Sequence, residues 1–421
     1  MTGPVDPAGP IFISHRSTDG TEPAVALARL LRASGLPVWL DQDDLPPGDI
    51  ATRLTAVLDH GLSGAVLVVT PDVGASTVIR NLELPKLLEL AKDPDFTFAI
   101  LTEVPDPAYP TSFDRHAPAT LLDPMASRPE LHAKPGIKQY SRIDLTAADL
   151  GRLFARARLS ALRRGRDSEP LTIDVQTRTL ASAYGSRADL VFRTAPPPKG
   201  RRVPEREVWE DLQRLLEWLA DVVGTVHPPE IRLTGGAHLS IGVAIGAGIP
   251  EPTGIPLDIE TTDGVVRQAR HRLTWRERLP VIGVRPRRRR IARGTGRPIA
   301  VLVDVAQSEG AATFVEWAAL NPTRFSTATT LARRGRLDPR SAAIVAAAVA
   351  DAIRSEARRR RTSEVLLFVR SPWPVAVLVG ASLSTLTVRL SEWDNSGGTP
   401  AYVDVATVRP GVGGSPIVEV A

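Results

Sequence analysis

Two stretches of this chain, 134 positions apart, carry the same pattern of residues. Residues 230–246 and 364–380 each begin with a strand pattern, pass through a tight turn with a small residue, and end in a short helical pattern at Gly246 and Gly380. An apolar run follows each copy. A repeat of this kind indicates two copies of one supersecondary unit. We therefore expect the C-terminal part of the chain to consist of two Rossmann-like halves joined in tandem.

The repeat extends to neighbouring elements. Helical patterns at 205–222 and 341–357 precede the two copies, and the strand pattern of 173–177 resembles that of 303–307, 130 positions further on. The alternative is a chance likeness between two unrelated strand, turn and helix units. The shared order of elements argues against it.

The N-terminal part alternates short apolar runs with helical patterns. Flat apolar runs closed by turn residues are typical of parallel strands covered on both faces. Residues 23–34, between the first two runs, have leucines at helical spacing. This alternation predicts a doubly wound parallel α/β sheet. The expected strands are 11–14, 37–41, 65–70 and 96–101.

A change of pattern near 165–170 marks the expected domain boundary. The stretch 103–140 is rich in proline and aspartate and is expected to be irregular surface, and a helical pattern follows at about 145–164. A chain of 421 residues also exceeds what one hydrophobic core usually organises. The expected domains are 1–165 and 166–421, the latter with halves at about 166–296 and 297–421.

The composition excludes several classes of protein. The chain has no cysteine, which excludes disulfides and thiolate metal sites, and its seven histidines form no cluster with metal-ligand spacing. We therefore expect neither a metal nor a cofactor. No apolar stretch is long enough to cross a bilayer and no signal-peptide pattern is present, so we expect a cytoplasmic protein without membrane association. The formal charge is −3 over 1–165 and +8 over 166–421, which favours an anionic partner for the C-terminal part.

Motifs in the N-terminal part lie at the ends of expected strands. The first strand reads Phe12-Ile13-Ser14 and is followed by Arg16 and Asp19; the second reads Val38-Trp39-Leu40-Asp41 and leads into an acidic loop, 41–49. Glu83 follows the third strand. In order and spacing these motifs resemble a TIR domain, which has a flavodoxin-like fold. The family pattern has a tryptophan at the position of Ile79.

The resemblance implies that Glu83 is the catalytic residue of an NAD+ hydrolase. One carboxylate can stabilise the oxocarbenium-like ribose that forms when the nicotinamide–ribose bond breaks. Without the resemblance, Glu83 could simply be a carboxylate favoured near the start of a helix. Trp39 or Phe12 could stack on a flat ring, although aromatic residues at strand ends more often belong to the core, and Arg16 could contact the pyrophosphate. The expected substrate-binding residues are Phe12, Ser14, Arg16, Trp39, Asp41 and Asp44.

The second copy of the repeat carries further motifs. Arg370-Ser371-Pro372-Trp373, Gly380 and Glu392-Trp393-Asp394 together resemble a SAVED domain, a fusion of two CARF-like halves that senses cyclic oligonucleotides. The resemblance implies that the ligand is a cyclic trinucleotide, and cyclic tri-adenylate is the one that we expect. Helix N-termini at the strand ends could offer N–H groups to phosphate, basic residues could neutralise it, and a tryptophan could stack on a base. The expected ligand-binding residues are Lys199, Arg201, Arg202, Gly235, His238, Arg370, Ser371, Trp373 and Trp393.

The combination resembles the TIR-SAVED effectors of cyclic-oligonucleotide antiphage signalling (CBASS). We hypothesise that ligand binding drives head-to-tail assembly into an oligomer or filament, in which the loop 41–49 of one subunit completes the Glu83 site of its neighbour. A TIR scaffold without enzymatic activity is the alternative. A third hypothesis is a nucleic-acid-binding module, but the arginine runs 287–290 and 358–361 are more simply solvated faces, and we do not expect binding of long nucleic acid.

Overall fold

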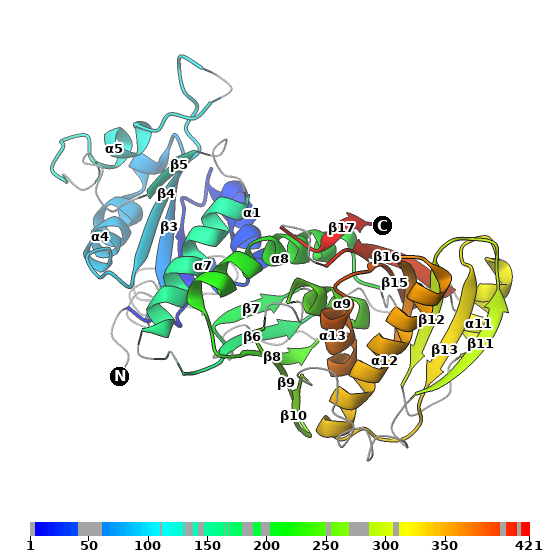
Figure 1. Cartoon of the computed structure of the whole chain (residues 1–421). Coiled ribbons are helices and arrows are strands. Elements are labelled where there is room, and N and C mark those ends of the chain that lie inside the picture. Colours follow the sequence, from blue (N-terminus) through cyan, green and yellow to red (C-terminus); the bar gives the residue numbers. More distant parts are fainter. Residues whose placement is uncertain are drawn as a thin grey trace. The chain divides into compact units, whose positions relative to one another are not determined.

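The chain divides into two compact units in the computed structural model (Figure 1). The first comprises Met1–Asp167 with Ala183–Phe192, and the second comprises Ser168–Ser182 with Arg193–Ala421. Across the described residues, no helix has the length and apolar character needed to cross a membrane. The structure describes residues 5–40, 61–109, 112–128, 131, 138–141, 147–164, 166, 168–178, 188–194, 203–249, 254–268, 286–305, 311–395, 401–410 and 414–421.

A five-stranded parallel sheet organises the first unit. Its order is β2-β1-β3-β4-β5, which is the flavodoxin-like order of a doubly wound sheet and confirms the predicted fold class. The central strand β3 is buried along its whole length because helices cover both faces. The strands are β1 (Ile11–Ser14), β2 (Val38–Leu40), β3 (Gly64–Val69), β4 (Thr97–Thr102) and β5 (Lys138–Ser141).

Helices lie on both faces of this sheet. The helix α4 contributes Leu84, Leu87 and Leu90 to a core cluster with one face of β3, while α1 contacts α7. The prediction that 103–140 is irregular is wrong in two places, α5 and β5. The first has only two turns, and the second reads Lys-Gln-Tyr-Ser, so neither shows the apolar pattern on which prediction depends. The helices are α1 (Thr21–Ala33), α4 (Leu84–Leu90), α5 (Ala117–Leu122) and α7 (Ala147–Arg163).

The second unit contains two sheets, one for each half of the repeat, although residues 190–192 of one edge strand fall in the first unit. The first has the order β10-β9-β8-β6-β7 and the second the order β11-β13-β12-β14-β15-β16-β17. The strands of the first are β6 (Leu171–Gln176), β7 (Leu190–Arg193), β8 (Ile231–Gly236), β9 (Leu257–Thr261) and β10 (Gly264–Arg267). Those of the second are β11 (Arg287–Arg293), β12 (Ile299–Asp304), β13 (Thr327–Ala332), β14 (Glu364–Arg370), β15 (Thr387–Asp394), β16 (Ala401–Val408) and β17 (Ile417–Val420).

The repeat recurs in the structure as equivalent elements. Strand β8 leads through a turn into α9, and β14 leads through a turn into α13, with N-cap residues His238 and Pro372 at matching positions. This confirms the prediction of two Rossmann-like halves. The helices of this unit are α8 (Arg206–Val226), α9 (Leu239–Gly248), α11 (Ala312–Leu320), α12 (Pro339–Arg360) and α13 (Trp373–Ser382).

The backbone register corrects the upstream part of the repeat. In the first half Gln176 lies opposite Gly236, and in the second half Asp304 lies opposite Arg370, the counterpart of Gly236. Asp304 therefore corresponds to Gln176, not to Asp174 as the sequence match suggested. A shift of two residues leaves every side chain on the same face of the strand, so the alternating pattern cannot reveal it.

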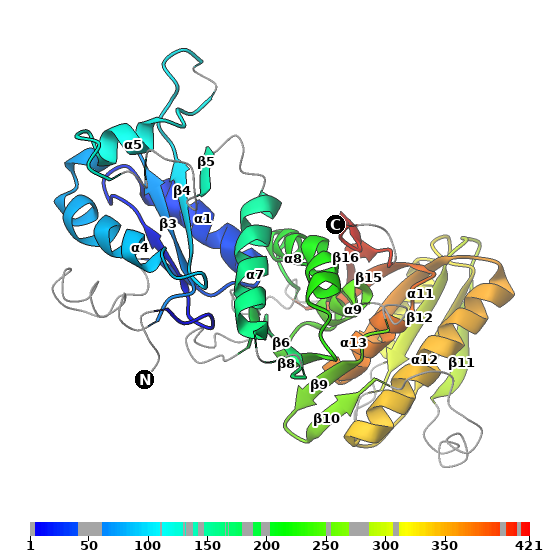
Figure 2. The same cartoon turned by 60° about the vertical axis from the view of Figure 1, so that its left-hand side comes forward.

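The two halves meet through close contact of α9 with α13, which lie side by side in Figures 1 and 2. A Cβ atom on Gly246 would lie 1.9 Å from the carbonyl oxygen of Val377, and one on Gly380 would lie 2.1 Å from that of Val243. Because Gly246 and Gly380, and likewise Val243 and Val377, are repeat partners, the contact is reciprocal. Early residues of each helix face early residues of the other, since Gly242 lies against Trp373 and Ala376. The helices therefore run in the same direction, with both N-termini at one end.

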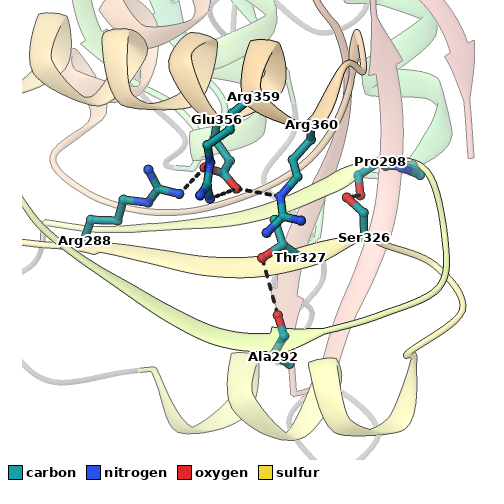
Figure 3. A network of polar contacts seen from close by, with 8 residues as sticks. All are labelled: Arg288, Ala292, Pro298, Ser326, Thr327, Glu356, Arg359 and Arg360. Atoms are coloured by element: carbon teal, nitrogen blue, oxygen red, sulfur yellow. Dashed lines mark hydrogen bonds and ion pairs between the residues drawn. The ribbon is translucent and has the colours of Figure 1, made fainter.

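A buried carboxylate joins α12 to the edge strand β11 (Figure 3). Glu356 accepts hydrogen bonds from Arg359 Nη2 at 2.6 Å and from Arg360 Nε at 3.1 Å, and it also binds Arg288. Burial alone would raise the pKa of Glu356, but the hydrogen bonds from Arg359 and Arg360 and the charge of Arg288 together lower it. Members of both arginine runs thus neutralise one carboxylate inside this half.

The close contact of α9 with α13 predicts that neither Gly246 nor Gly380 can be replaced by a residue with a side chain. We expect Gly246→Ala and Gly380→Ala each to destabilise the second unit by about 1–3 kcal/mol, because the new methyl group would overlap backbone. Gly224→Ala is the matched control: it lies in α8 with nothing within 4 Å of a Cβ, so it should stabilise by about 0.5–1 kcal/mol. Denaturant titration of the full chain measures all three. Wild-type stability in both interface variants would contradict the described packing.

Candidate functional site

Glu83 and Ser14 come together at the carboxyl end of the first sheet. Ser14 ends β1, and Glu83 follows β3, the strand next to it. The Ser14 hydroxyl donates a hydrogen bond to Glu83 Oε2. In a sheet of this order, the crevice between β1 and β3 is the topological switch point, where ligands bind. Two of the residues predicted from sequence therefore meet at the expected edge of the sheet.

A local irregularity in the helix positions Glu83. Residues Ile79–Glu83 form one turn of π-helix, which continues into α4. Pro85, in the first turn of α4, has no N–H to donate to the carbonyl four residues earlier, which favours a wider turn before it. Glu83 is 7% exposed and Ser14 is 2% exposed, so the carboxylate is held in a largely dry environment.

The other predicted substrate-binding residues have distinct surroundings. Arg16 Nη1 lies 3.1 Å from the carboxylate of Asp72, which belongs to the loop after β3. Phe12 is buried in the core cluster, and Trp39 is half-buried against the same cluster. Their positions therefore favour a packing role for Phe12, with Trp39 partly accessible. Asp41 and Asp44 lie outside the described residues.

The chemistry of this site is that of a single carboxylate. Within the described ranges, no group of three His, Asp or Glu side chains could hold a metal ion. A buried carboxylate oriented by a hydroxyl can stabilise positive charge that develops beside it, and a low local dielectric strengthens that effect.

In the first half of the second unit, the turn after β8 is fixed by backbone geometry. Gly235 has φ +93, and a Cβ there would lie 2.3 Å from the Val175 carbonyl oxygen, so only glycine fits. Thr177 Oγ1 accepts a hydrogen bond from the His238 N–H at 3.0 Å and lies 2.9 Å from His238 Nδ1. Burial, with a smaller contribution from the charge of Arg178, lowers the pKa of His238 to about 4. His238 is therefore neutral at pH 7 and cannot neutralise a phosphate.

A side chain of the second half occupies the N-terminus of α9. Glu392 Oε1 on β15 accepts hydrogen bonds from the Ser240 N–H at 2.9 Å and from the Ser240 hydroxyl at 2.7 Å. Burial raises the pKa of Glu392, although both hydrogen bonds and the charge of Arg178 oppose the rise. An internal carboxylate thus takes the place where an anionic ligand would meet this helix.

In the second half, the corresponding turn opens into a pocket of about 490 Å³, within the size range of small-molecule sites. Pro374, the repeat counterpart of Ser240, lies in the first turn of α13 and removes one N–H donor from that helix end. Ser371 and Trp373, both predicted from sequence, line the pocket. The lining residues are Thr261, Asp263, Val266, Val305, Gly335, Arg336, Leu337, Pro339, Ala342, Ser371, Pro372, Trp373 and Pro374.

A polar cluster lies at the end of β12. Asp304 is fully buried and binds Arg334 Nη2 at 2.8 Å, while its Oδ1 atom has no hydrogen-bond partner among the described residues. Burial raises the pKa of Tyr402 to about 12; the nearby charges of Asp304 and Glu392 add to the rise, and that of Arg370 opposes it. Arg370 and Asp304 are register partners in the sheet.

The structure therefore separates the sequence candidates of this unit. Trp393 packs against the aromatic core cluster of the second sheet, whereas Trp373 lines the pocket. Lys199, Arg201 and Arg202 lie outside the described residues. Asp263, Arg336 and Asp304 were not predicted: the first two lie in no motif, and the shifted register obscured the third. Glu392 stood in the quoted motif without an assigned role.

Residues 11–127 match the model of the TIR domain family. A search of curated protein sequences gives no match.

A comparison with solved structures gives several matches. One is a Cap4 SAVED/CARF-domain containing receptor from Acinetobacter baumannii with the cyclic trinucleotide 3'3'3'-cAAA, at 13% identity and a TM-score of 0.46, covering 77% of this chain and 84% of that one. The Cap4 receptor of Moraxella osloensis has 12% identity and a TM-score of 0.40, covering 81% and 86%. A TIR-STING receptor from C. gigas in complex with 2',3'-cGAMP has 12% identity and a TM-score of 0.26, covering 44% and 60%.

The contact between Glu392 and Ser240 predicts a pH-dependent stability. The raised pKa of Glu392 means that the folded state bears a cost of ionisation that grows as pH rises above the unfolded value of about 4.3. Glu392→Gln removes this titration and keeps an oxygen that accepts from Ser240. We expect the variant to be more stable than wild type near pH 7, with the difference shrinking toward about pH 4.

Thermal unfolding of the full chain across this pH range measures the effect. Glu364→Gln, at an exposed position on β14, is the control and should show no such trend. A stability difference for Glu392→Gln that is constant with pH would contradict the assignment.

Proposed function

Because residues 11–127 form a TIR domain, we propose that this chain is an NAD+ hydrolase that a cyclic trinucleotide activates. The observation that carries the enzymatic part is the buried Glu83 carboxylate at the switch point of the sheet, oriented by Ser14. NAD+ is the substrate in this proposal.

The proposed reaction breaks the bond between the nicotinamide nitrogen and the ribose. The bonding electrons leave with nicotinamide, which departs as a neutral molecule, and the ribose acquires oxocarbenium character. The Glu83 carboxylate stabilises this positive charge, and Ser14 holds the carboxylate in position. Water then adds to the ribose carbon and releases a proton, which yields ADP-ribose; a nucleophile within the substrate would instead yield a cyclised product.

The second unit is the proposed sensor, a SAVED domain that binds cyclic tri-adenylate. Its two halves, packed through a reciprocal helix contact, support this assignment, as do its net positive charge and the pocket at the turn before α13. The pocket offers an indole, at Trp373, beside a strand end. The A. baumannii receptor is solved with 3'3'3'-cAAA, which makes that compound the first probe to test.

Activation is proposed to occur through head-to-tail assembly of subunits. The two halves have the same backbone plan but different surfaces, so contact between unlike faces of two subunits would produce an open oligomer or filament. Assembly would place the loop 41–49 of one subunit against the Glu83 site of the next. To move the equilibrium from mostly inactive to mostly active, the ligand must favour the assembled state by about 5 kcal/mol.

The enzymatic proposal predicts ligand-dependent release of nicotinamide. We expect wild type to cleave NAD+ only with 3'3'3'-cAAA present, and Glu83→Gln to lose at least about 100-fold in rate, because the amide lacks the stabilising charge. Glu89→Gln is the matched control: Glu89 is an exposed carboxylate on α4, and the variant should retain wild-type activity. Nicotinamide release followed by chromatography measures all three.

The outcomes separate this proposal from its alternatives. Activity that survives Glu83→Gln would refute the role of Glu83. Ligand-dependent association without loss of NAD+ would favour a TIR scaffold, and salt-sensitive binding of long nucleic acid without a response to the cyclic ligand would favour a nucleic-acid-binding module.

The assembly proposal predicts an increase in particle mass upon addition of 3'3'3'-cAAA. Light scattering of the full chain, with and without ligand, should show large species only with ligand. The Glu83→Gln variant should assemble like wild type because Glu83 is buried and the substitution keeps the size of its side chain. A particle that stays monomeric while NAD+ is consumed would remove assembly from the scheme.

A further inference from the structure

The two helix N-termini of this unit offer an anion fewer free N–H donors than an ordinary helix end does. Glu392 occupies the N-terminus of α9, and Pro374 removes a donor from that of α13. His238 is neutral at pH 7. A cationic side chain is the group best suited to neutralise a phosphate in the pocket beside α13, and Arg336 is the single basic residue among the described residues that line it.

Arg336 lies at a junction between the two halves. It belongs to the connection from β13 to α12 in the second half, directly after Gly335, whose φ of +99 turns the chain. Arg336 Nη2 lies 2.6 Å from Oδ1 of Asp263, which is at the tip of the β9–β10 hairpin of the first half. Both residues line the pocket. The ion pair therefore joins the halves at the pocket wall.

A competing anion can replace Asp263 as the partner of Arg336 at little cost in free energy. The side chains of Arg336 and Asp263 are 73% and 49% exposed, and exposed pairs contribute little because water competes for both groups. A phosphate accepts two hydrogen bonds from a guanidinium in the same forked geometry as a carboxylate does, and such charge-assisted hydrogen bonds are stronger than neutral ones. The strand β10 of this hairpin also contacts α12, independently of the ion pair. The hairpin would therefore keep its contact with α12 if the ion pair between Asp263 and Arg336 broke.

We propose that Arg336 binds a phosphate of the cyclic oligonucleotide and that Asp263 is the partner that this phosphate displaces. The inference rests on the proposed sensor function of the second unit and assigns the anion-binding residue of its pocket. Trp373 and Leu337, which line the same pocket, supply apolar surface for a base. Asp263 competes with the ligand, so the pair sets the concentration at which the sensor responds.

The proposal predicts opposite effects from the two partners of one ion pair. Asp263→Asn frees Arg336 and removes a negative charge from the pocket, and we expect it to tighten binding of 3'3'3'-cAAA about 2- to 5-fold. Arg336→Gln removes the phosphate partner and should weaken binding about 10-fold or more. If the ion pair only held the hairpin in place, both substitutions would break it and would change affinity in the same direction.

Calorimetric titration of the full chain with 3'3'3'-cAAA measures the affinities. Asp351→Asn is the matched control, because Asp351 forms an exposed ion pair with Arg354 on α12, away from the pocket lining, and it should bind as wild type does. Changes of the same sign in Asp263→Asn and Arg336→Gln, or wild-type affinity in Arg336→Gln, would overturn the proposal. Failure of wild type itself to bind would instead refute the sensor function.

Discussion

Close packing of α9 against α13 is the contact on which the second unit depends. Gly246 and Gly380 let each helix approach the backbone of the other, and a methyl group at either position would overlap a carbonyl oxygen. Because the helices run in the same direction, their N-termini lie at one end of the unit. The turns that follow β8 and β14 are consequently neighbours across an approximate two-fold axis. A ligand at this end can contact residues of both halves.

The same backbone plan carries different chemistry in the two halves. In the first, Ser240 donates two hydrogen bonds to Glu392, so a carboxylate of the protein itself occupies the N-terminus of α9. In the second, proline replaces that serine and a pocket lies beside the helix. The two halves thus share a symmetric scaffold, whereas different residues at single positions make the two turns unlike each other. If the second unit binds a ligand as proposed, the two halves would meet it with different groups, Arg336 among them.

The main polar feature of the first unit is a buried carboxylate, that of Glu83, next to the hydroxyl of Ser14. The switch point of the sheet places Ser14 and Glu83 next to each other although they are 69 positions apart in the chain. A turn of π-helix before Pro85 lets the side chain enter the crevice without breaking the helix. Burying a carboxylate costs free energy unless it is hydrogen-bonded, and Ser14 supplies a hydrogen bond here.

The sequence alone determined the doubly wound sheet, the tandem halves, and the candidacy of Glu83, Ser14, Ser371 and Trp373, because apolar periodicity and short motifs are local. Only the tertiary structure decided the register of Asp304, the pairing of Glu392 with Ser240, and the meeting of Asp263 with Arg336. Those pairs join residues far apart in the chain, and no local pattern specifies which distant partner a charge will find. The packing of one half against the other decides that.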